Sequence, residues 1–534
     1  MKGILKSRKW RAIGFFILAF IVFGGLLMYR NLDQELTLPS ENWSRDIELP
    51  VTISGEHNET FVREDGGRYH IYTHGKDGIN QVVIDSKLNV LEQSSLSVDI
   101  PKSAPFWVRD HAVLTIKDHK LILYKNGEKQ TLADSVEGIV VDENSVVVWK
   151  GKQLYTVDLK SFTLQSAGKL DTNIHNVILE EKADSFLAIT KTESTPAKFH
   201  LIQKQGGNSF KQTYEFSLSG TQFSESDTHF AGFNHALSGF DYVYRDHVLS
   251  IYFSSFGMTH FGLQRKNYLA TIPVHQVGEN ATLEKLTLIG KGKQKLQNAK
   301  GFQVTFQQGK PVLLFSSSGY MPYIGTATNV YRAEKQGEKW LAINVSGTRK
   351  PSEDPVWLND HTVLWYDMNS LEQQFLKGAS QNPQVISRSL QLDGHDWTFA
   401  AGDTLFSMSK SLLLLVYTLF CLVPLGLFLL IMHVVNINLM ERNPRWVKLV
   451  SMGLFLVSEL YLIQAFLGDS LGGSVPEYLS FAGSLYVIPI ALAVLSWFIT
   501  NLVKGKEWEN MTQIFYFIGI DVWMLMLLVG PYLI

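Results

Sequence analysis

Two acidic residues lie inside long apolar stretches in the C-terminal quarter of the chain. Glu459 falls in the run 446–467 and Asp521 in the run 512–533. Ionisable groups are costly in hydrocarbon, so acids at such positions are candidates for function. At about 1.5 Å per residue, counted from the cytoplasmic ends inferred below, Glu459 lies about 18 Å deep and Asp521 about 15 Å deep. The two carboxyl groups could therefore meet near the midplane of the bilayer and share a proton or bind a cation.

A structural role for the same acids is an open alternative. A protonated acid can hydrogen-bond to a serine of a neighbouring helix and lock the packing, and the candidate serines are Ser458, Ser484 and Ser496. Contact with a partner protein is a third alternative.

Two prolines stand in other apolar runs. Pro424 and Pro489 fall at comparable depth by residue count, and each frees a backbone carbonyl and is a candidate helix kink. Together with the two acids, they indicate a helical bundle with a polar centre.

Histidines supply the remaining candidates for chemistry. Asp-His pairs recur at 110–111, 246–247 and 360–361, each before a Val-Leu sequence. A carboxylate can orient an imidazole for catalysis or metal binding, but recurrence in one sequence context favours a role in turns. His70 and His74 share a strand face, and no further ligand follows at a recognisable spacing. The single cysteine, Cys421, excludes a thiolate metal cluster. We expect no metal, no cofactor and no catalytic site.

Five apolar runs are long enough to cross a membrane. The first, 12–28, follows a basic N-terminal segment, and the others are 411–435, 446–467, 478–503 and 512–533. Basic residues of short loops stay on the cytoplasmic side, which places the loops with Arg442, Arg445, Lys504 and Lys506 inside. The loop at 468–477 carries acids but no Lys or Arg and belongs outside. These assignments agree with a cytoplasmic N-terminus and an uncleaved signal-anchor.

The segment between the first and second runs is expected to be all-β. Short runs rich in β-branched and aromatic residues alternate with Gly, Asn and Asp turns, as in a sandwich, a barrel or a propeller. The sequence PFWVRDHAVL at 105–114 aligns with PVWLNDHTVL at 355–364, and RDHVL at 245–249 is a third, shorter copy. Spaced repeats of this kind favour a β-propeller, and the length allows seven or eight blades of about 40–60 residues.

Composition narrows the class of protein. A net charge of −2 gives no basic face for nucleic acid, so we expect no nucleic-acid partner. A large exported segment without cysteine suits a bacterial surface rather than a eukaryotic secreted protein. Four Asn-x-Ser/Thr sequons would permit the eukaryotic alternative; they begin at Asn42, Asn58, Asn280 and Asn344.

The sequence thus predicts three parts: a cytoplasmic N-terminus and anchor helix at 1–30, an extracytoplasmic propeller-like domain at 31–409, and a four-helix membrane domain at 410–534. The expected location is the bacterial cytoplasmic membrane. The first functional hypothesis is a binding or scaffolding subunit of a cell-envelope complex, because propellers chiefly bind; its partners would be the lipid bilayer and other envelope proteins. The alternatives are an autonomous proton- or ion-coupled transporter or sensor that uses Glu459 and Asp521, and an extracellular hydrolase on a propeller scaffold.

Overall fold

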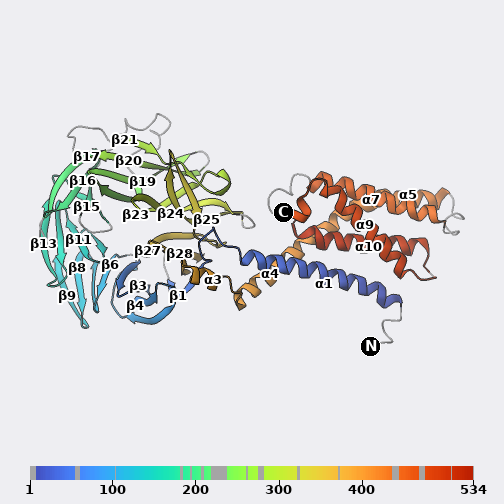
Figure 1. Ribbon diagram of the computed structural model, residues 1–534, viewed down its shortest axis with the longest axis horizontal. Helices are drawn as coiled ribbons and strands as arrows, with labels where there is room; N and C mark the ends of the chain where they lie inside the picture. Colours follow the sequence, from blue (N-terminus) through green and yellow to red (C-terminus); the bar gives the residue numbers. More distant parts are fainter. Residues whose placement is uncertain are drawn as a thin grey trace. The chain divides into compact units, whose positions relative to one another are not determined.

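The chain forms two compact units in the computed structural model (Figure 1). The helical unit comprises Met1–Thr37 and Leu392–Ile534, and the propeller unit comprises Leu38–Gln391. The structure describes residues 8–532 except 54–59, 103, 181–184, 193–194, 206–209, 218–236, 260–261, 275–281, 322–324, 371–372, 436–443, 468–475 and 507.

The propeller unit contains seven sheets, each a blade of four or five strands. Six follow the order of the chain, and the seventh combines the last three strands with the first. Blade 1 contains β2 (Phe61–Asp65), β3 (Arg68–Gly75), β4 (Gly78–Asp85) and β5 (Val90–Leu96). Blade 2 contains β6 (Phe106–Arg109), β7 (Ala112–Lys117), β8 (Lys120–Lys125) and β9 (Glu128–Asp134). Blade 3 contains β10 (Gly138–Asp142), β11 (Ser145–Lys150), β12 (Gln153–Asp158) and β13 (Thr163–Lys169).

The remaining blades are built in the same way. Blade 4 contains β14 (Ile174–Leu179), β15 (Ser185–Thr192), β16 (Thr195–Lys204) and β17 (Phe210–Ser217). Blade 5 contains β18 (Leu237–Arg245), β19 (Val248–Thr259), β20 (Gly262–Pro273) and β21 (Thr282–Lys285). Blade 6 contains β22 (Leu288–Ile289), β23 (Gln297–Gln307), β24 (Lys310–Met321), β25 (Gly325–Gln336) and β26 (Lys339–Asn344), with a 3-10 turn, η3 (Lys291–Lys293), before β23. Blade 7 contains β27 (Ser352–Asn359), β28 (Thr362–Ser370), β29 (Gln373–Ser380) and β1 (Ile47–Ile53).

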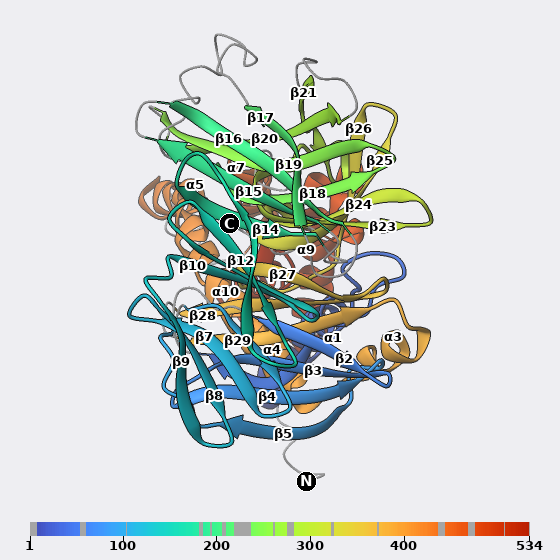
Figure 2. The ribbon, with the colours of Figure 1, turned by 90° about the vertical axis from the view of Figure 1, so that its left-hand side faces the viewer.

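The blades follow one another around a ring (Figure 1). One strand of each blade contacts its counterpart in the next blade, in the succession β2, β6, β10, β14, β18, β23 and β27, and the last strand of each four-stranded blade lies at the outer edge of its sheet. Figure 2 shows this order for β2, β3, β4 and β5. Burial follows position, because the inner residues of β7 and β8 are buried whereas most of β5 and β9 is exposed. The prediction of a propeller is confirmed, with seven blades.

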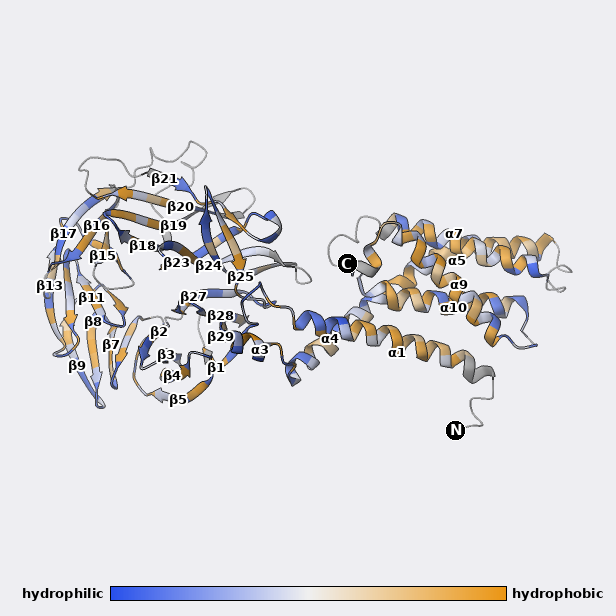
Figure 3. Cartoon of the chain, viewed as in Figure 1, coloured by the Kyte–Doolittle hydropathy of each residue, from blue (hydrophilic) through white to orange (hydrophobic). Residues whose placement is uncertain are grey.

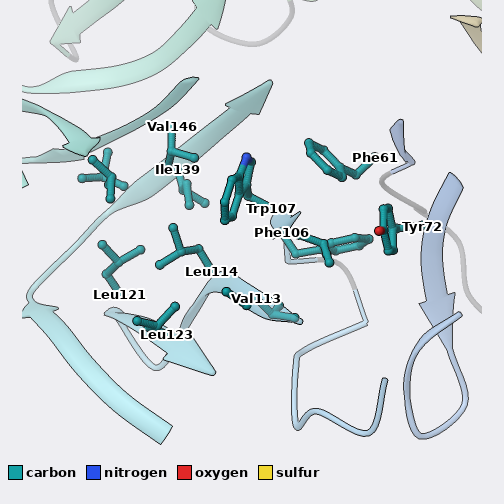
Figure 4. Packing of buried hydrophobic residues seen from close by; sticks show 14 of the residues in the cluster. Phe61, Tyr72, Phe106, Trp107, Val113, Leu114, Leu121, Leu123, Ile139 and Val146 are labelled. Carbon is teal, nitrogen blue, oxygen red and sulfur yellow. The ribbon is translucent and has the colours of Figure 1, made fainter. Parts of the chain in front are cut away.

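Apolar side chains of neighbouring blades form a shared core (Figure 4). One buried cluster contains residues of three blades: Phe61 of blade 1, Trp107 and Leu114 of blade 2, and Ile139 and Val146 of blade 3. These blades therefore bury their faces against their neighbours.

The first strand closes the ring. β1 pairs antiparallel with β29, with Ile47 opposite Gly378 and Ile53 opposite Gln374. Just before β1, the Ser44 N–H donates to the Ser380 carbonyl at 3.0 Å, and the Ser380 N–H donates back to Ser44 Oγ at 3.0 Å. Residues more than 300 positions apart thus join the two ends of the propeller.

The recurring Asp-His pairs occupy equivalent turns. They connect the first and second strands of blades 2, 5 and 7, where Arg109 pairs with Ala112, Arg245 with Val248 and Asn359 with Thr362. At 110–111 and 246–247 both residues have positive φ, from 48° to 63°, as a two-residue hairpin turn requires. Their role in turns, predicted from the repeat, is confirmed.

The helical unit contains five helical segments that are long and apolar enough to span a membrane, among the described residues. These are Ala12–Glu35 within α1 (Arg8–Glu35); α4 (Gly394–Ser411) joined with α5 (Leu413–Val435); Arg445–Ala465 within α7 (Arg445–Leu467); α9 (Ser484–Val503); and α10 (Asn510–Leu528). Figure 3 shows the apolar residues along these helices. Shorter segments are α3 (Pro383–Ser389) of the propeller unit, α8 (Glu477–Ser480) and η4 (Gly530–Tyr532).

The first and last long helices run side by side in the same direction. Tyr516 on α10 donates to the Ala12 carbonyl on α1 at 3.1 Å, and Trp523 Nε1, further along α10, donates to the Phe16 carbonyl at 3.0 Å. Helix α4 runs antiparallel to α1, since Asn31 Nδ2 donates to Thr404 Oγ1 at 2.9 Å and Met408 lies near Gly24. These directions are those expected of five successive crossings. Among the described residues, the number of helices that are long and apolar enough to span a membrane matches the predicted five.

Candidate intramembrane site

Three helices bring polar side chains together inside the helical unit. Glu459 on α7 and Asp521 on α10 are 3% and 0% exposed, and their carboxyl groups interact electrostatically. Ser496 on α9, also buried, donates from its hydroxyl to Asp521 Oδ1 at 2.9 Å. The two acids that the sequence singled out are thus neighbours, and of the three candidate serines Ser496 is a partner of Asp521.

The carboxyl groups of Glu459 and Asp521 pair with each other. Beyond that pairing, neither carboxyl oxygen of Glu459 nor Asp521 Oδ2 has a hydrogen-bond partner among the described residues. Orphaned buried oxygens cost about 1–3 kcal/mol each unless a proton, an ion or a ligand satisfies them. Two adjacent carboxylate charges in hydrocarbon have a still higher free-energy cost. The simplest way to avoid this cost is for the two carboxyl groups to share one proton.

A fourth helix approaches the same point. Cys421 on α5 is 4% exposed, and both acids act on its thiol electrostatically. The spacing of residues in the sequence could not predict that Cys421 lies near the acids. Which α5 residues face the inside of the bundle depends on how the helix is rotated about its own axis. The polar centre therefore draws on α5, α7, α9 and α10.

The two prolines lie in different settings. Pro424 is inside α5 and Pro489 inside α9, and both helices continue through the proline. Pro424 is exposed and Pro489 is buried. Helix α9 begins at Ser484, after a left-handed Gly483, so Pro489 lies in its second turn rather than at its centre. Neither proline contacts the acids through any hydrogen bond found among the described residues.

Other sequence candidates have local partners. His74 Nε2 lies 3.0 Å from the Ala104 carbonyl, and His70 Nδ1 lies 3.0 Å from Gln81 Nε2. No group of three or more potential metal ligands occurs in the part of the chain that the structure describes.

A second acid pair, which the sequence analysis missed, lies where the propeller closes. Asp46 precedes β1 and accepts from the Gly347 N–H at 3.1 Å, and Asp367 on β28 accepts from Ser352 Oγ at 2.8 Å and Trp365 Nε1 at 3.0 Å. Burial and the neighbouring Asp367 raise the pKa of Asp46 from 3.8 to about 7. The two residues are 321 positions apart, and no local motif marks them.

No protein-family model and no curated protein matches the chain.

Replacing Ser496 with alanine is expected to destabilise the helical unit by about 1–3 kcal/mol, because Asp521 would lose the hydroxyl that satisfies its Oδ1. Ser458→Ala is the matched control, since the Ser458 hydroxyl donates to the Leu454 carbonyl of its own helix at 2.8 Å. The single cysteine, Cys421, is buried, so a fluorogenic thiol reagent reports thermal unfolding in detergent. An equal change in Tm for both variants would contradict a special role for Ser496.

Proposed function

We propose that the chain is a membrane-anchored binding or scaffolding subunit of a bacterial cell-envelope complex. The observation that carries the proposal is a closed seven-bladed propeller joined at both of its ends to apolar helices. Propellers offer broad surfaces for binding, and attachment through two chain segments suits a part that presents a partner near a membrane. In this proposal the N-terminus is cytoplasmic, residues 31–409 are extracytoplasmic, and the bundle docks on other membrane proteins.

The orientation can be tested with single cysteines, because the native Cys421 is buried. A membrane-impermeant maleimide added to intact cells is expected to label Asp158→Cys, at the end of β12, and not Lys506→Cys, between α9 and α10. Labelling in the reverse pattern would refute the proposed orientation.

Partner binding is tested by site-specific photocrosslinking in intact membranes. One protein carries a photoreactive residue at Leu341 of β26, which is 40% exposed. A second protein carries it at Val457 of α7, which is 64% exposed. We expect a stoichiometric adduct with one envelope protein from at least one position. Only lipid adducts or adducts between copies of this chain, with no copurifying partner, would overturn the proposal.

The acid pair supports a second candidate, a proton- or ion-coupled transporter or sensor. The specific observation is that the two acids are buried and that their carboxyl groups interact with each other. In proteoliposomes with an internal pH dye, the intact protein would then carry a proton flux that the Glu459→Gln, Asp521→Asn double variant lacks. Equal flux from both proteins, or none from either, would exclude it.

A further inference from the structure

Three basic side chains meet at one end of the helical unit, where α7 and α10 begin and α9 ends. Arg445 and Lys448 lie in the first turn of α7, and Lys504 follows directly after α9. The charges of Arg445 and Lys504 both act on Lys448. A hydrogen bond also ties α10 to this end of the bundle, because Asn510 Nδ2 donates to the Pro444 carbonyl, just before α7, at 2.9 Å. The packing of the helices therefore gathers the three cations into one cluster.

The positive charge of this cluster is not neutralised by any ion pair found among the described residues. Lys448 Nζ donates to Gln513 Oε1 of α10 at 2.9 Å, and Lys504 Nζ donates to Asn501 Oδ1 at 2.9 Å. These amide oxygens orient the two ammonium groups but carry no net charge. Like charges held close together repel one another, and an anion bound between them removes that repulsion. The cluster therefore favours a negatively charged partner.

Two of the three helix ends at this point add to the positive potential. Helix α7 begins at Arg445 and α10 begins at Asn510, and the first N–H groups of a helix carry a partial positive charge. The side chain of Glu509, the N-cap residue of α10, makes no capping hydrogen bond to these N–H groups. The helix ends supplement the three cations, which define the site.

The position of the cluster decides which anion it suits. Arg445 and Lys504 stand at the ends of two helices that are long and apolar enough to span a membrane, and basic side chains at such ends lie at the level of the lipid head groups. Leu449 and Leu502, close to the cations on the same two helices, are 56% and 57% exposed. A soluble anion would use the cations alone. A phospholipid would place its phosphate on the cations and its acyl chains on the exposed apolar surface beside them.

We propose that Arg445, Lys448 and Lys504 bind the head group of one anionic phospholipid, whose acyl chains lie along α7 and α9. Basic pockets between the ends of spanning helices suit phosphate head groups, because the charges are complementary and the dielectric constant is low beside the hydrocarbon. The inference goes beyond the binding role of the propeller and does not depend on it.

The test is scintillation-proximity binding of tritiated phosphatidylglycerol to the full-length protein, delipidated and immobilised in detergent. We expect saturable binding at one site per chain, and unlabelled phosphatidylcholine should compete about tenfold less well than unlabelled phosphatidylglycerol. The Lys448→Gln, Lys504→Gln double variant is expected to bind about 25-fold more weakly, because each basic residue near a membrane surface contributes a factor of about five. The single variant Arg445→Gln changes an exposed side chain, so it should fold and should bind about fivefold more weakly.

Lys506→Gln is the matched control for charge. Lys506 is exposed two residues beyond Lys504, and it is not among the groups found to act on Lys448, so its replacement should leave the Kd unchanged. The Lys448→Arg, Lys504→Arg double variant keeps both charges and should still prefer phosphatidylglycerol to phosphatidylcholine.

Three results would overturn the proposal. Equal competition by the two phospholipids would reduce the contact to ordinary solvation by lipid. Equal weakening by Lys506→Gln and Arg445→Gln would replace a site with diffuse attraction to a basic membrane surface. Displacement of the bound phosphatidylglycerol by inorganic phosphate, at an ionic strength where chloride does not displace it, would assign the cluster to a soluble anion.

Discussion

Replacing Trp43 with alanine is expected to destabilise the propeller by about 3–5 kcal/mol, the usual cost of removing a large buried aromatic side chain. Trp43 is 0% exposed and packs with Val330 of blade 6 and with Val363 and Trp365 of blade 7. It belongs to the segment before β1, so it holds the chain that closes the ring against the last two blades. The substitution is therefore expected to weaken the contact between the segment before β1 and the last two blades, which closes the ring.

Pulse proteolysis of the full-length protein in urea measures this effect, because the opened propeller is cleaved and the closed one is not. Leu341→Ala is the control, since Leu341 of β26 is 40% exposed. If the two variants shift the urea midpoint equally, Trp43 does not hold the closure. A loss confined to Trp43→Ala, with cleavage first near β1 or β29, is the expected outcome.

The second large effect is a dependence of propeller stability on pH, caused by Asp46. Its folded-state pKa of about 7 exceeds the ordinary value of 3.8, through burial first and the neighbouring Asp367 second. Gly347, Lys377 and Arg45 oppose the shift only in part. The pKa of Asp367 is also raised, chiefly by burial, so both acids act with the same sign.

A raised carboxyl pKa means that the folded state binds the proton more tightly than the unfolded chain. Stability from this group is therefore complete below about pH 4 and is lost as the pH rises towards 7. At about 1.4 kcal/mol per pH unit, and allowing for partial exposure of Asp46, we expect the loss to be about 2–4 kcal/mol by pH 8.

Asp46→Asn is expected to remove most of this loss. The amide oxygen can still accept from the Gly347 N–H, and the amide group can donate towards Asp367. Thermal unfolding at several pH values should show a higher Tm for the variant at pH 8 and little difference at pH 4.

Asp158→Asn is the control of opposite sign. Backbone N–H groups of Lys160 and Ser161 lower the pKa of Asp158, so its removal should destabilise at neutral pH and matter less as the pH falls below 4. A wild-type Tm that does not change between pH 4 and pH 8, or an Asp46→Asn variant that keeps the wild-type slope, would contradict the assignment.

Local patterns in the sequence predict the parts of this protein that depend on local physics. Hydropathy over about 20 residues is sufficient for the five spans, because hydrocarbon requires continuous apolar surface. The repeated sequence that contains Trp107 in one copy and Trp357 in the other, each followed by an Asp-His turn, predicts the propeller. Equivalent positions in different blades require the same turn geometry. The count of seven rests on the strand pairing, including the sharing of the last blade between β1 and β29.

The sites are less predictable because they depend on distant contacts. Depth along a helix indicates that Glu459 and Asp521 could meet, but the choice of Ser496 over Ser458 depends on how α9 faces α10. The pair of Asp46 with Asp367 is beyond a sequence reading, since neither lies in a motif and the closure alone brings them together.

Because β1 closes the ring by pairing with β29, the ring cannot close during synthesis until β29 has been made. Chains are made at about 5–20 residues per second, so roughly 15–65 s pass between the synthesis of β1 and that of its partner β29. Throughout that delay β1 is an unpaired edge that could recruit other chains. Its sequence, IELPVTI, carries Pro50 in the middle, and the register shifts between Glu48 and Thr52 in the completed sheet. Pro50 lacks a backbone N–H and so interrupts the row of hydrogen-bond donors along β1. This disfavours pairing of β1 with other chains before β29 is made.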